Sequence, residues 1–399
     1  MSKQIEGKYF GTSGPLFRLY MVTALLTLVT LGIYRFWAKT RLRTYVWSAA
    51  SADDDSFEYT GTGLEKFLGF LVAIVILALY LGFVQILLTF VGLSIIPDGD
   101  SPAAVAAQAV AINLSILSVV PLIFFAQYRA RRYKLARTRW RGIRFGMEKG
   151  AWGYAFRAMG YYLLTVVTLG LLAPLATYRL EKYKADRSWF GDARFEQHGR
   201  WQALYGGMKH IFIALGIMVA GLFAIVFGAE NDQGALAGLG AFMGFVAYIW
   251  FLVGLLSYRV FAFNYLTGQK VLDGQIRFGA RLRTSTLLGI FVVGSIVVGL
   301  LMGVIFGVIG GLFAFSGEAI ITGSAGPGLF LVIAILYGGA FLMAGALGMV
   351  MITQPIIEHV VENLTVYEAQ HLDVIRQRAA DTGADAEGFA DALDVGGAL

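Results

Sequence analysis

Cysteine is absent from the sequence, and charged residues make up only 15% of its 399 positions. Without cysteine the chain has no disulfide framework, no thiolate nucleophile and no cysteine-ligated metal site. Soluble domains carry about 25% charged residues, because water must wet their surface. The shortage of charge therefore excludes a soluble globular fold. The four histidines leave little material for a histidine-rich metal site, and we expect no cofactor.

Long apolar runs account for most of the chain. A helix that crosses a bilayer needs roughly 20 mostly apolar residues. Six runs meet this length, at 67–96, 103–127, 210–229, 236–257, 286–315 and 328–353. Short linkers join them in pairs. The sequence therefore predicts an all-α polytopic membrane protein with six firm transmembrane helices in three hairpins.

The placement of charge predicts the topology. The three linkers within the hairpins, at 97–102, 230–235 and 316–327, contain acidic residues and no lysine or arginine. The segments between the hairpins are basic, which accounts for the net charge of +6. Lysine and arginine concentrate in short cytoplasmic loops. We expect the basic loops and the C-terminus to face the cytoplasm and the acidic linkers to face outward.

Two shorter apolar stretches, at 16–37 and 154–177, contain copies of one sequence. The eight residues 25–32 match 163–170 with one Leu/Val exchange. Basic sequence flanks each stretch on both sides, so a full crossing would place one basic loop outside. Each stretch is therefore either a re-entrant or interfacial hairpin that turns at Thr30–Gly32 or Thr168–Gly170, or a true span. The second alternative raises the total to eight helices.

Short strand-like segments recur in the basic loops. Residues 188–195 and 271–278 each read as two strands around a two-residue turn, the second with the favoured Asp-Gly pair. Residues 138–145 and 45–59 fit this pattern more loosely. A single hairpin is marginal in water, so we expect these cytoplasmic β-hairpins to join into a small sheet or to rest on lipid headgroups.

One motif carries a resemblance to a known family. The segment Thr-Leu-Gly-Ile-Tyr-x-x-Trp-Ala-Lys at 30–39 precedes Arg41, Arg43 and Tyr45, and Phe-x-Tyr-x-Gly-Thr-Gly follows at 57–63. Together they resemble the YjgN family of bacterial multi-pass inner-membrane proteins, which is built around a domain of unknown function. The resemblance implies a bacterial inner-membrane location and this architecture. The family offers no established activity or catalytic residues.

Two sets of residues within the apolar runs are candidates for a role in the membrane. Gly299, Gly303 and Gly307 recur every fourth residue and predict close helix packing, or else a glycine-lined gate. The polar residues predict either interhelical hydrogen bonds or a solute pathway, and no ionisable residue that could couple ions lies deep in the spans. These polar candidates are Gln108, Asn113, Thr27, Thr30, Thr165 and Thr168.

Four apolar segments end in a Tyr-Arg pair, and we expect the four pairs to share one register. Aromatic anchoring with arginine snorkelling to phosphate explains such pairs. Specific binding of anionic phospholipid headgroups is the functional alternative, and its candidate ligands are Arg35, Arg129, Arg179 and Arg259. We expect no nucleic-acid partner, because lipid phosphates already lie beside these basic residues.

The sequence divides into an integral membrane domain at 1–365 and an acidic Ala/Asp/Gly-rich tail at 366–399, for which we expect little order. No nucleophile elbow, P-loop, dinucleotide fingerprint or HExxH motif occurs, so we expect no enzyme. Two functions remain. One is permeation or transport of a small or amphipathic solute without an ion-coupling site. The other is anionic-lipid binding or scaffolding through the basic aromatic face. The sequence carries no signal for the oligomeric state.

Overall fold

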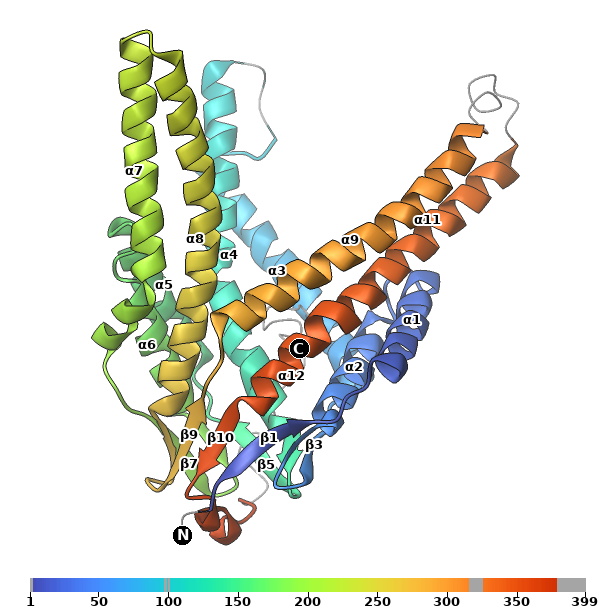
Figure 1. The fold of residues 1–399 in the computed structure, drawn as a ribbon, viewed down its shortest axis with the longest axis vertical. Coiled ribbons are helices and arrows are strands. Elements are labelled where there is room, and N and C mark those ends of the chain that lie inside the picture. The colour runs from blue at the N-terminus through green and yellow to red at the C-terminus, as the bar shows by residue number, and fades with distance from the viewer. Residues whose placement is uncertain (1–2, 97–98, 100, 316–325, 379–399) are drawn as a thin grey trace.

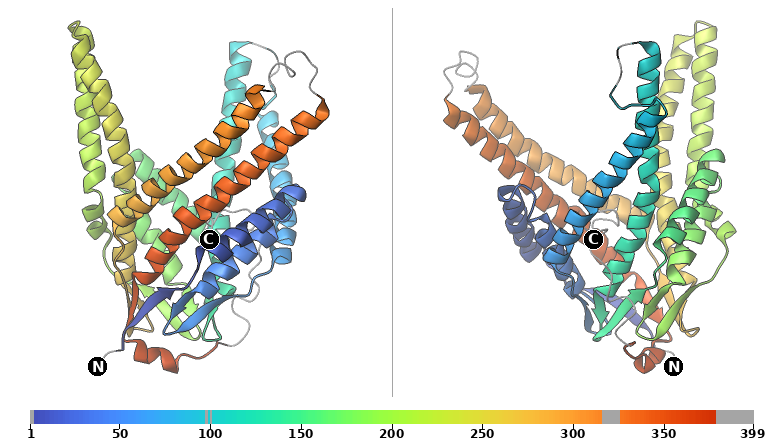
Figure 2. Two further views of the ribbon diagram at one scale, coloured as in Figure 1. Left: turned by 45° about the vertical axis from the view of Figure 1, so that its right-hand side comes forward. Right: turned by 180° about the vertical axis from the view of Figure 1, so that it is seen from behind.

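The chain repeats one unit, a helical hairpin between two short β-strands, five times. The computed structural model describes residues 3–96, 99, 101–315 and 326–378. Residues 316–325 of the predicted linker at 316–327, and residues 97, 98 and 100 of the one at 97–102, lie outside these residues. All five helical hairpins rise from one side of a ring of strands, and the three longest splay apart (Figures 1 and 2).

Ten antiparallel strands close into a barrel, in the order β1-β10-β9-β8-β7-β6-β5-β4-β3-β2. They are β1 (Ile5–Tyr9), β2 (Ala50–Ala52), β3 (Asp55–Tyr59), β4 (Thr138–Trp140), β5 (Ile143–Met147), β6 (Ser188–Phe190), β7 (Ala193–Gln197), β8 (Lys270–Leu272), β9 (Ile276–Ala280) and β10 (Leu364–Tyr367). The two ends of the chain complete the ring, because Ile5 in β1 pairs with Val366 in β10.

The prediction of an all-α fold is therefore wrong. The expected hairpins at 188–195 and 271–278 are present as β6–β7 and β8–β9, and the looser pair as β2–β3 and β4–β5. Each hairpin alone would leave two unpaired strand edges. Because consecutive helical hairpins rise side by side, their β-hairpins become neighbours, and closure of the ring pairs every edge.

Apolar side chains fill the barrel. Trp140, Phe190, Leu272 and Ile276 are buried in one cluster with residues from both chain ends. The space left among them is only about 90 Å³. The interior of the barrel is thus a packed core that holds the five repeats together.

The helices fall into a long and a short class. The long hairpins are α3 (Gly63–Phe90) with α4 (Pro102–Ala136), α7 (Lys209–Glu230) with α8 (Gly234–Gly268), and α9 (Thr284–Phe315) with α11 (Pro327–Gly348). The short hairpins are α1 (Ser13–Val29) with α2 (Arg35–Ala49), and α5 (Ala151–Val167) with α6 (Ala173–Ala185). A π-helical turn, η2 (Met349–Thr353), connects α11 to α12 (Gln354–Glu362), and the 3-10 turn η1 (Trp201–Gly207) precedes α7.

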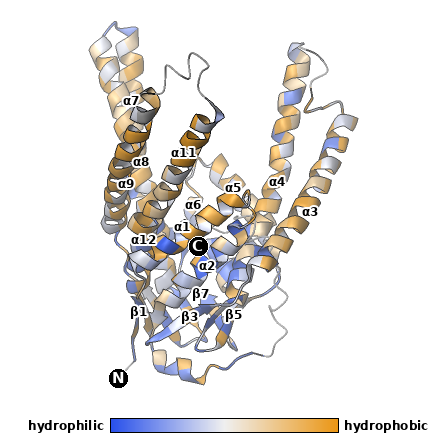
Figure 3. Ribbon diagram, turned by 90° about the vertical axis from the view of Figure 1, so that its right-hand side faces the viewer, coloured by the Kyte–Doolittle hydropathy of each residue, from blue (hydrophilic) through white to orange (hydrophobic). Residues whose placement is uncertain are grey.

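The described residues contain six helices that are long and apolar enough to cross a membrane, at the six runs predicted from the sequence. The apolar surface of these helices contrasts with the more polar barrel (Figure 3). At 1.5 Å per residue, the 35 residues of α4 span about 50 Å. This length covers a hydrocarbon layer of about 30 Å and leaves about 20 Å between the bilayer and the barrel.

The two copied segments form hairpins that turn back toward the barrel. The 17 residues of α1 and of α5 span only about 25 Å, so each hairpin ends about where the long helices enter the hydrocarbon. Both turns lie at the predicted apices, where Leu31 and Gly32, and likewise Leu169 and Gly170, adopt positive φ angles. This is the geometry of the re-entrant or interfacial alternative.

The repeat extends well beyond the eight copied residues. Every element from β1 to β3 begins 138 residues before its counterpart between β5 and β7, as Ile5 and Ile143, Ser13 and Ala151, and Arg35 and Ala173 illustrate. Residues 5–59 and 143–197 therefore align without a gap. Positions can be compared between the two copies directly.

The ordered fold continues past the predicted domain boundary at 366. Residues 364–367 form β10, and the 3-10 turn η3 (Ala369–Val374) packs Leu372 against the barrel core. Beyond it, the Arg376 amide donates to Asp192 Oδ1 at 3.0 Å. The segment to residue 378 thus belongs to the barrel, whereas 379–399, the rest of the predicted tail, lie outside the described residues.

Closure of the barrel can be tested by cross-linking in this cysteine-free chain. Glu6 and Thr365 are direct partners across β1 and β10, which places their Cα atoms within disulfide range. The double variant Glu6→Cys/Thr365→Cys should form an intramolecular disulfide under mild oxidation, detected by electrophoretic mobility and peptide mapping. In the control Glu6→Cys/Arg277→Cys, the second cysteine lies one strand further away and two residues along that strand, at roughly 12 Å, and should stay reduced. Equal cross-linking of both pairs would contradict the ring.

Candidate functional site

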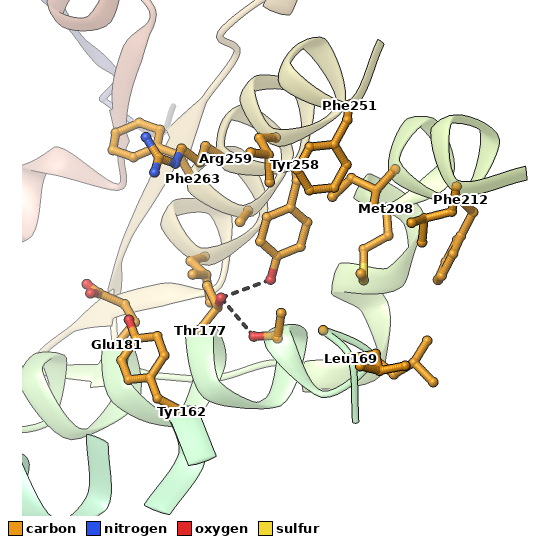
Figure 4. A pocket seen from close by; sticks show the side chains of 18 of the residues that line it. Tyr162, Leu169, Thr177, Glu181, Met208, Phe212, Phe251, Tyr258, Arg259 and Phe263 are labelled. Atoms are coloured by element: carbon orange, nitrogen blue, oxygen red, sulfur yellow. Dashed lines mark hydrogen bonds between the residues drawn. The ribbon is translucent and has the colours of Figure 1, made fainter. Parts of the chain in front are cut away.

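A cavity of about 820 Å³ lies between the second short hairpin, α5–α6, and the long hairpin α7–α8. Its walls are apolar. Leu169 at the hairpin apex, Phe212 on α7, and Phe251 and Leu255 on α8 are among the lining side chains. In Figure 4, Leu169, Met208 and Phe212 lie toward one end, and Glu181 and Arg259 lie toward the other. The cavity therefore has an apolar end at the hairpin apex and a charged end toward the barrel.

Three basic residues and one acidic residue are among the lining residues. Arg131 comes from the end of α4, Arg259 from α8, Lys270 from the start of β8, and Glu181 from α6. At neutral pH these four side chains carry a net charge of +2. The charged end of the cavity is thus suited to an anion.

Glu181 is the centre of an ion-pair cluster. Arg131 donates to both of its carboxylate oxygens at 3.2 Å. Lys270 Nζ lies 3.2 Å from Oε1, and Lys184 Nζ lies 3.0 Å from Oε2. The Glu181 side chain is only 18% exposed. The cluster joins α4, α6 and β8, and so fixes the short hairpin relative to the long helices beside it.

Burial and the neighbouring charges act on Glu181 in opposite directions. Burial by itself would raise the pKa of Glu181, but Arg131, Lys184 and Lys270 outweigh it and hold this pKa well below the ordinary value of 4.5. Burial lowers the pKa of Lys184, and Glu181 opposes that shift. The carboxylate is therefore ionised at neutral pH and keeps two lysines and an arginine together in a confined space.

A hydrogen bond closes the middle of the cavity wall. Tyr258 Oη donates to Thr177 Oγ1 at 2.9 Å, which links α8 to α6 (Figure 4). The threonine hydroxyl in turn donates to the Ala173 carbonyl at 3.0 Å. These groups satisfy one another, so the wall between the charged and apolar ends presents little unmet polarity.

The four predicted headgroup ligands do not share one register. Arg129 and Arg179 each lie nine residues before the next strand, at Thr138 and Ser188, whereas Arg35 lies fifteen residues before Ala50. The structural counterpart of Arg179 is Arg41, and Arg35 instead begins α2 beside the hairpin apex. Among the four, Arg259 alone lines the cavity at α7–α8, and Arg35 lines a different one.

Two of the four tyrosines of these pairs also differ from interfacial anchors. Tyr128 and Tyr178 are buried, and their hydroxyls donate to the Glu148 and Gly199 carbonyls. They belong to the packed layer that joins the helices to the barrel. Their recurrence in the sequence reflects the repeated fold.

The predicted polar pathway residues lie at separate places. The Gln108 amide donates to the Ile95 carbonyl near the outer end of the first long hairpin, and Asn113 donates to a carbonyl of its own helix. Thr27 and Thr165 also donate within their helices. Thr30 and Thr168 do the same, and each accepts the amide four residues ahead, which closes the apex turn. The structure does not bring these groups into one cavity.

The glycine stripe on α9 is uncovered in the described chain. A Cβ atom built at Gly299, Gly303 or Gly307 would meet nothing within 4 Å. Close glycine packing occurs in α7–α8 instead, where a Cβ at Gly221 would lie 2.9 Å from the Gly240 carbonyl. Small residues there let two long helices run in backbone contact.

Sequence reasoning missed Glu181, Arg131 and Lys270. Their three elements are separated by about 50 and 90 residues, and the pairing of strands β4 to β8 brings them together. The sequence did contain one feature that could have pointed to Glu181. Glu181 is a single acidic residue within the basic helix α6, at the position that Arg43 occupies in the first copy. Within the described ranges, no group of three or more histidine, cysteine or acidic side chains could hold a metal ion.

Six helices long and apolar enough to cross a membrane define a multi-pass membrane protein, whose described residues also form two short helical hairpins and a closed barrel. The chain belongs to the family described as bacterial protein of unknown function (DUF898), which matches residues 4–392. This confirms the predicted relationship to the YjgN proteins and the inner-membrane location.

The curated relatives are similar over part of their length. Inner membrane protein YjgN of Salmonella typhimurium is 25% identical over 189 residues, which are 41% of this chain and 43% of the relative. The YjgN protein of Escherichia coli O157:H7 is 30% identical over 151 residues, 37% of this chain and 33% of the relative. The matches thus span less than half the length of these relatives. No solved structure matches the chain significantly.

The Glu181 cluster predicts a pH-dependent contribution to stability. Glu181→Gln leaves three confined cations without their carboxylate and should lower the free energy of unfolding by on the order of 3 kcal/mol at pH 7. Because the pKa of Glu181 is depressed in the folded state, its contribution is present above the ordinary pKa of 4.5 and is lost as the pH falls. Thermal unfolding in detergent should therefore show a difference in melting temperature between wild type and variant, and this difference should become smaller at acidic pH.

Glu148 supplies the matched control. It pairs with Arg194 at 2.8 Å, but both side chains are more than one third exposed. Glu148→Gln should lower the free energy of unfolding by less than about 1 kcal/mol. Equal destabilisation by the two substitutions, or a Glu181→Gln effect that does not change with pH, would contradict the assigned role of the cluster.

Proposed function

We propose that this protein binds an anionic amphiphile, most directly an anionic phospholipid of the cytoplasmic leaflet, in the cavity between α5–α6 and α7–α8. The observation that carries the proposal is the joining of apolar walls to an excess of cations in one cavity. An apolar solute would leave the cations unmatched, and a small hydrophilic anion would leave the apolar walls wet.

The size of the cavity supports this ligand class. Pockets for small molecules have volumes of about 300–1,000 Å³, and about 820 Å³ lies within that range. The apolar end lies at the hairpin apex, about where the long helices enter the hydrocarbon, so an acyl chain can enter from the bilayer. The headgroup then meets Arg259 first and the Glu181 cluster below it.

The cluster also supports an anion rather than a cation. Arg131 and Lys270 are about 35% and 20% exposed and already share Glu181. A bound phosphate would add a second negative charge opposite these cations and Arg259. Charge-assisted hydrogen bonds are stronger than those between neutral groups. Each basic group near anionic lipid adds about 1 kcal/mol to the free energy of binding.

We propose that the barrel faces the cytoplasm. The basic residues lie in the helix ends and strands around the barrel, and the acidic residues Glu230 and Asp232 lie at the far end of the hairpin α7–α8. Lysine and arginine favour the cytoplasmic side. The cavity then opens toward the leaflet that carries anionic lipid.

Permeation of a solute through the long hairpins is the second candidate suggested by the sequence. It receives less support, because the three hairpins diverge from the barrel and the polar candidates lie apart. We likewise propose a binding role rather than a catalytic one. Glu181, Arg131 and Lys270 at the charged end of the cavity are engaged in ion pairs that fix the fold.

Lipid binding can be measured by cross-linking a photoactivatable-chain phosphatidylglycerol to the protein in detergent. Arg259→Gln removes one cation from the cavity without breaking the Glu181 cluster and should weaken labelling of α8 peptides about fivefold. Arg179→Gln is the matched control, because it removes an exposed arginine that does not line the cavity. Equal loss with both variants would favour binding to the general basic face and contradict the cavity.

A cavity-filling variant tests the apolar end separately. Leu255 lines the cavity, and Leu252 lies on the same helix, is similarly exposed and does not line it. Leu255→Trp should block labelling, whereas Leu252→Trp should leave it within about twofold of wild type, because Leu252 is not among the residues that line the cavity. Phosphatidylethanolamine with the same reactive chain should label weakly. Unchanged labelling of Leu255→Trp would refute the assignment.

The proposed orientation predicts which single cysteines an impermeant thiol reagent reaches. Asn231 lies in the exposed turn between α7 and α8, and Gln275 lies in the exposed turn between β8 and β9. In cells with a permeabilised outer membrane, Asn231→Cys should be labelled and Gln275→Cys should require lysis. The reverse pattern would place the barrel outside the cytoplasm.

A further inference from the structure

A second cavity, of about 660 Å³, lies beside the first short hairpin, α1–α2, where Leu342 of α11 contributes to its wall. Leu28 and Leu31 line its apolar part, and Arg35 and Lys39 on α2 are its basic residues. No carboxylate occurs among the described residues that line it. This cavity is separate from the one to which the function proposed above is assigned.

The gapless alignment of the two short hairpins relates this cavity to the first one. Five aligned positions line the cavity in both copies, which is the same face of the repeated hairpin. The pairs are Ala24 with Tyr162, Leu31 with Leu169, Gly32 with Gly170, Arg35 with Ala173, and Lys39 with Thr177. The duplicated element has therefore kept a cavity on this face in both places.

The two copies differ in the source of positive charge. In the second copy, Ala173 and Thr177 are uncharged, and Arg131, Arg259 and Lys270 supply the cations from neighbouring elements. In the first copy, the aligned residues Arg35 and Lys39 supply them from the hairpin itself. Both cavities thus combine an apolar wall with an excess of two positive charges among the lining residues.

Arg35 and Lys39 are placed to act on one ligand. They are four residues apart on α2, so they lie on the same face, with Cβ atoms about 6 Å apart. Arg35 begins α2 directly after the apex turn, and Leu31 at that turn is 94% exposed. Because the apex lies about where the long helices enter the hydrocarbon, the two cations lie near the depth of lipid phosphates, with Leu28 and Leu31 beside them.

We propose that the α1–α2 cavity is a second binding site for an anionic phospholipid, with Arg35 and Lys39 as ligands of the headgroup phosphate. The inference takes its ligand class from the function proposed above, but its residues are different. The lipid phosphate is bound at the hairpin apex, and an acyl chain packs against Leu28, Leu31 and Leu342. One protein thus holds two lipids, one at each copy of the repeat.

The same photoactivatable phosphatidylglycerol tests this site, with labelled peptides mapped by mass spectrometry. Wild type should be labelled both on α8 and on α1 or α11. Arg35→Gln/Lys39→Gln should weaken the α1 and α11 label about 30-fold and leave the α8 label unchanged. Arg259→Gln should weaken the α8 label about fivefold and leave the α1 and α11 label unchanged. The control Arg139→Gln/Arg277→Gln removes two exposed basic residues of the barrel and should change neither label.

A variant at the apolar part keeps the test valid if the charge variant fails to fold. Leu28 lines the cavity, and its neighbour Val29 is exposed and does not. Leu28→Trp should remove the α1 and α11 label, and Val29→Trp should retain it. Inorganic phosphate at the same concentration as the lipid should not compete.

The outcomes separate this inference from the proposed function. An α1 and α11 label that survives both Arg35→Gln/Lys39→Gln and Leu28→Trp overturns the second site, even where Arg259→Gln weakens the α8 label. Loss of the α1 and α11 label in Arg35→Gln/Lys39→Gln and in Leu28→Trp supports the second site. If Arg259→Gln and Leu255→Trp then leave the α8 label unchanged, the first site is refuted. Displacement of the label by inorganic phosphate would overturn the assignment to a lipid.

Discussion

Pairing of β1 with β10 is the constraint on which the rest of the structure depends. It joins Ile5 near the start of the chain to Val366 near the end of the described residues, and it turns five separate β-hairpins into one closed ring. The ring forces all helical hairpins to rise from one side. It also fixes their order around the barrel, so that α5–α6 lies beside α7–α8 and α1–α2 lies beside α11. Both cavities are consequences of that order.

The charged cluster at Glu181 depends on pairing of neighbouring strands within the same ring. Its carboxylate binds cations from α4, α6 and β8, which approach one another only when the strands between them are paired. Confinement would make the separate charges costly, and mutual pairing offsets that cost. The result is a preformed basic surface under an apolar cavity. A ligand that is apolar at one end and anionic at the other matches both parts.

The sequence predicted well those features that are local. Each of the six spans is a continuous apolar run, and β6–β7 and β8–β9 depend on turns of two residues. The apices of the short hairpins were found because Thr30 and Thr168 recur in identical surroundings. Closure of the barrel was not predicted, since it pairs residues more than 350 positions apart. The register of the arginines was misread, because the Tyr-Arg pair at Arg35 does not align with the pair at Arg179 when the strands are used as reference.

The repeat explains most directly why the two proposed lipid sites lie at equivalent places in the fold. A strand–hairpin–strand unit was duplicated, and its cavity-lining face was kept while the source of charge changed between Arg35 and Lys39 in one copy and Arg259 and Lys270 in the other. A structure of the protein in a bilayer disc that contains phosphatidylglycerol, at a resolution that shows lipids, tests this account most directly. We expect a closed ten-strand ring and elongated density in the cavity between α5–α6 and α7–α8, with its phosphate beside Arg259. An open ring, or a cavity filled by its own side chains with lipid density only on the outer basic face, would contradict it.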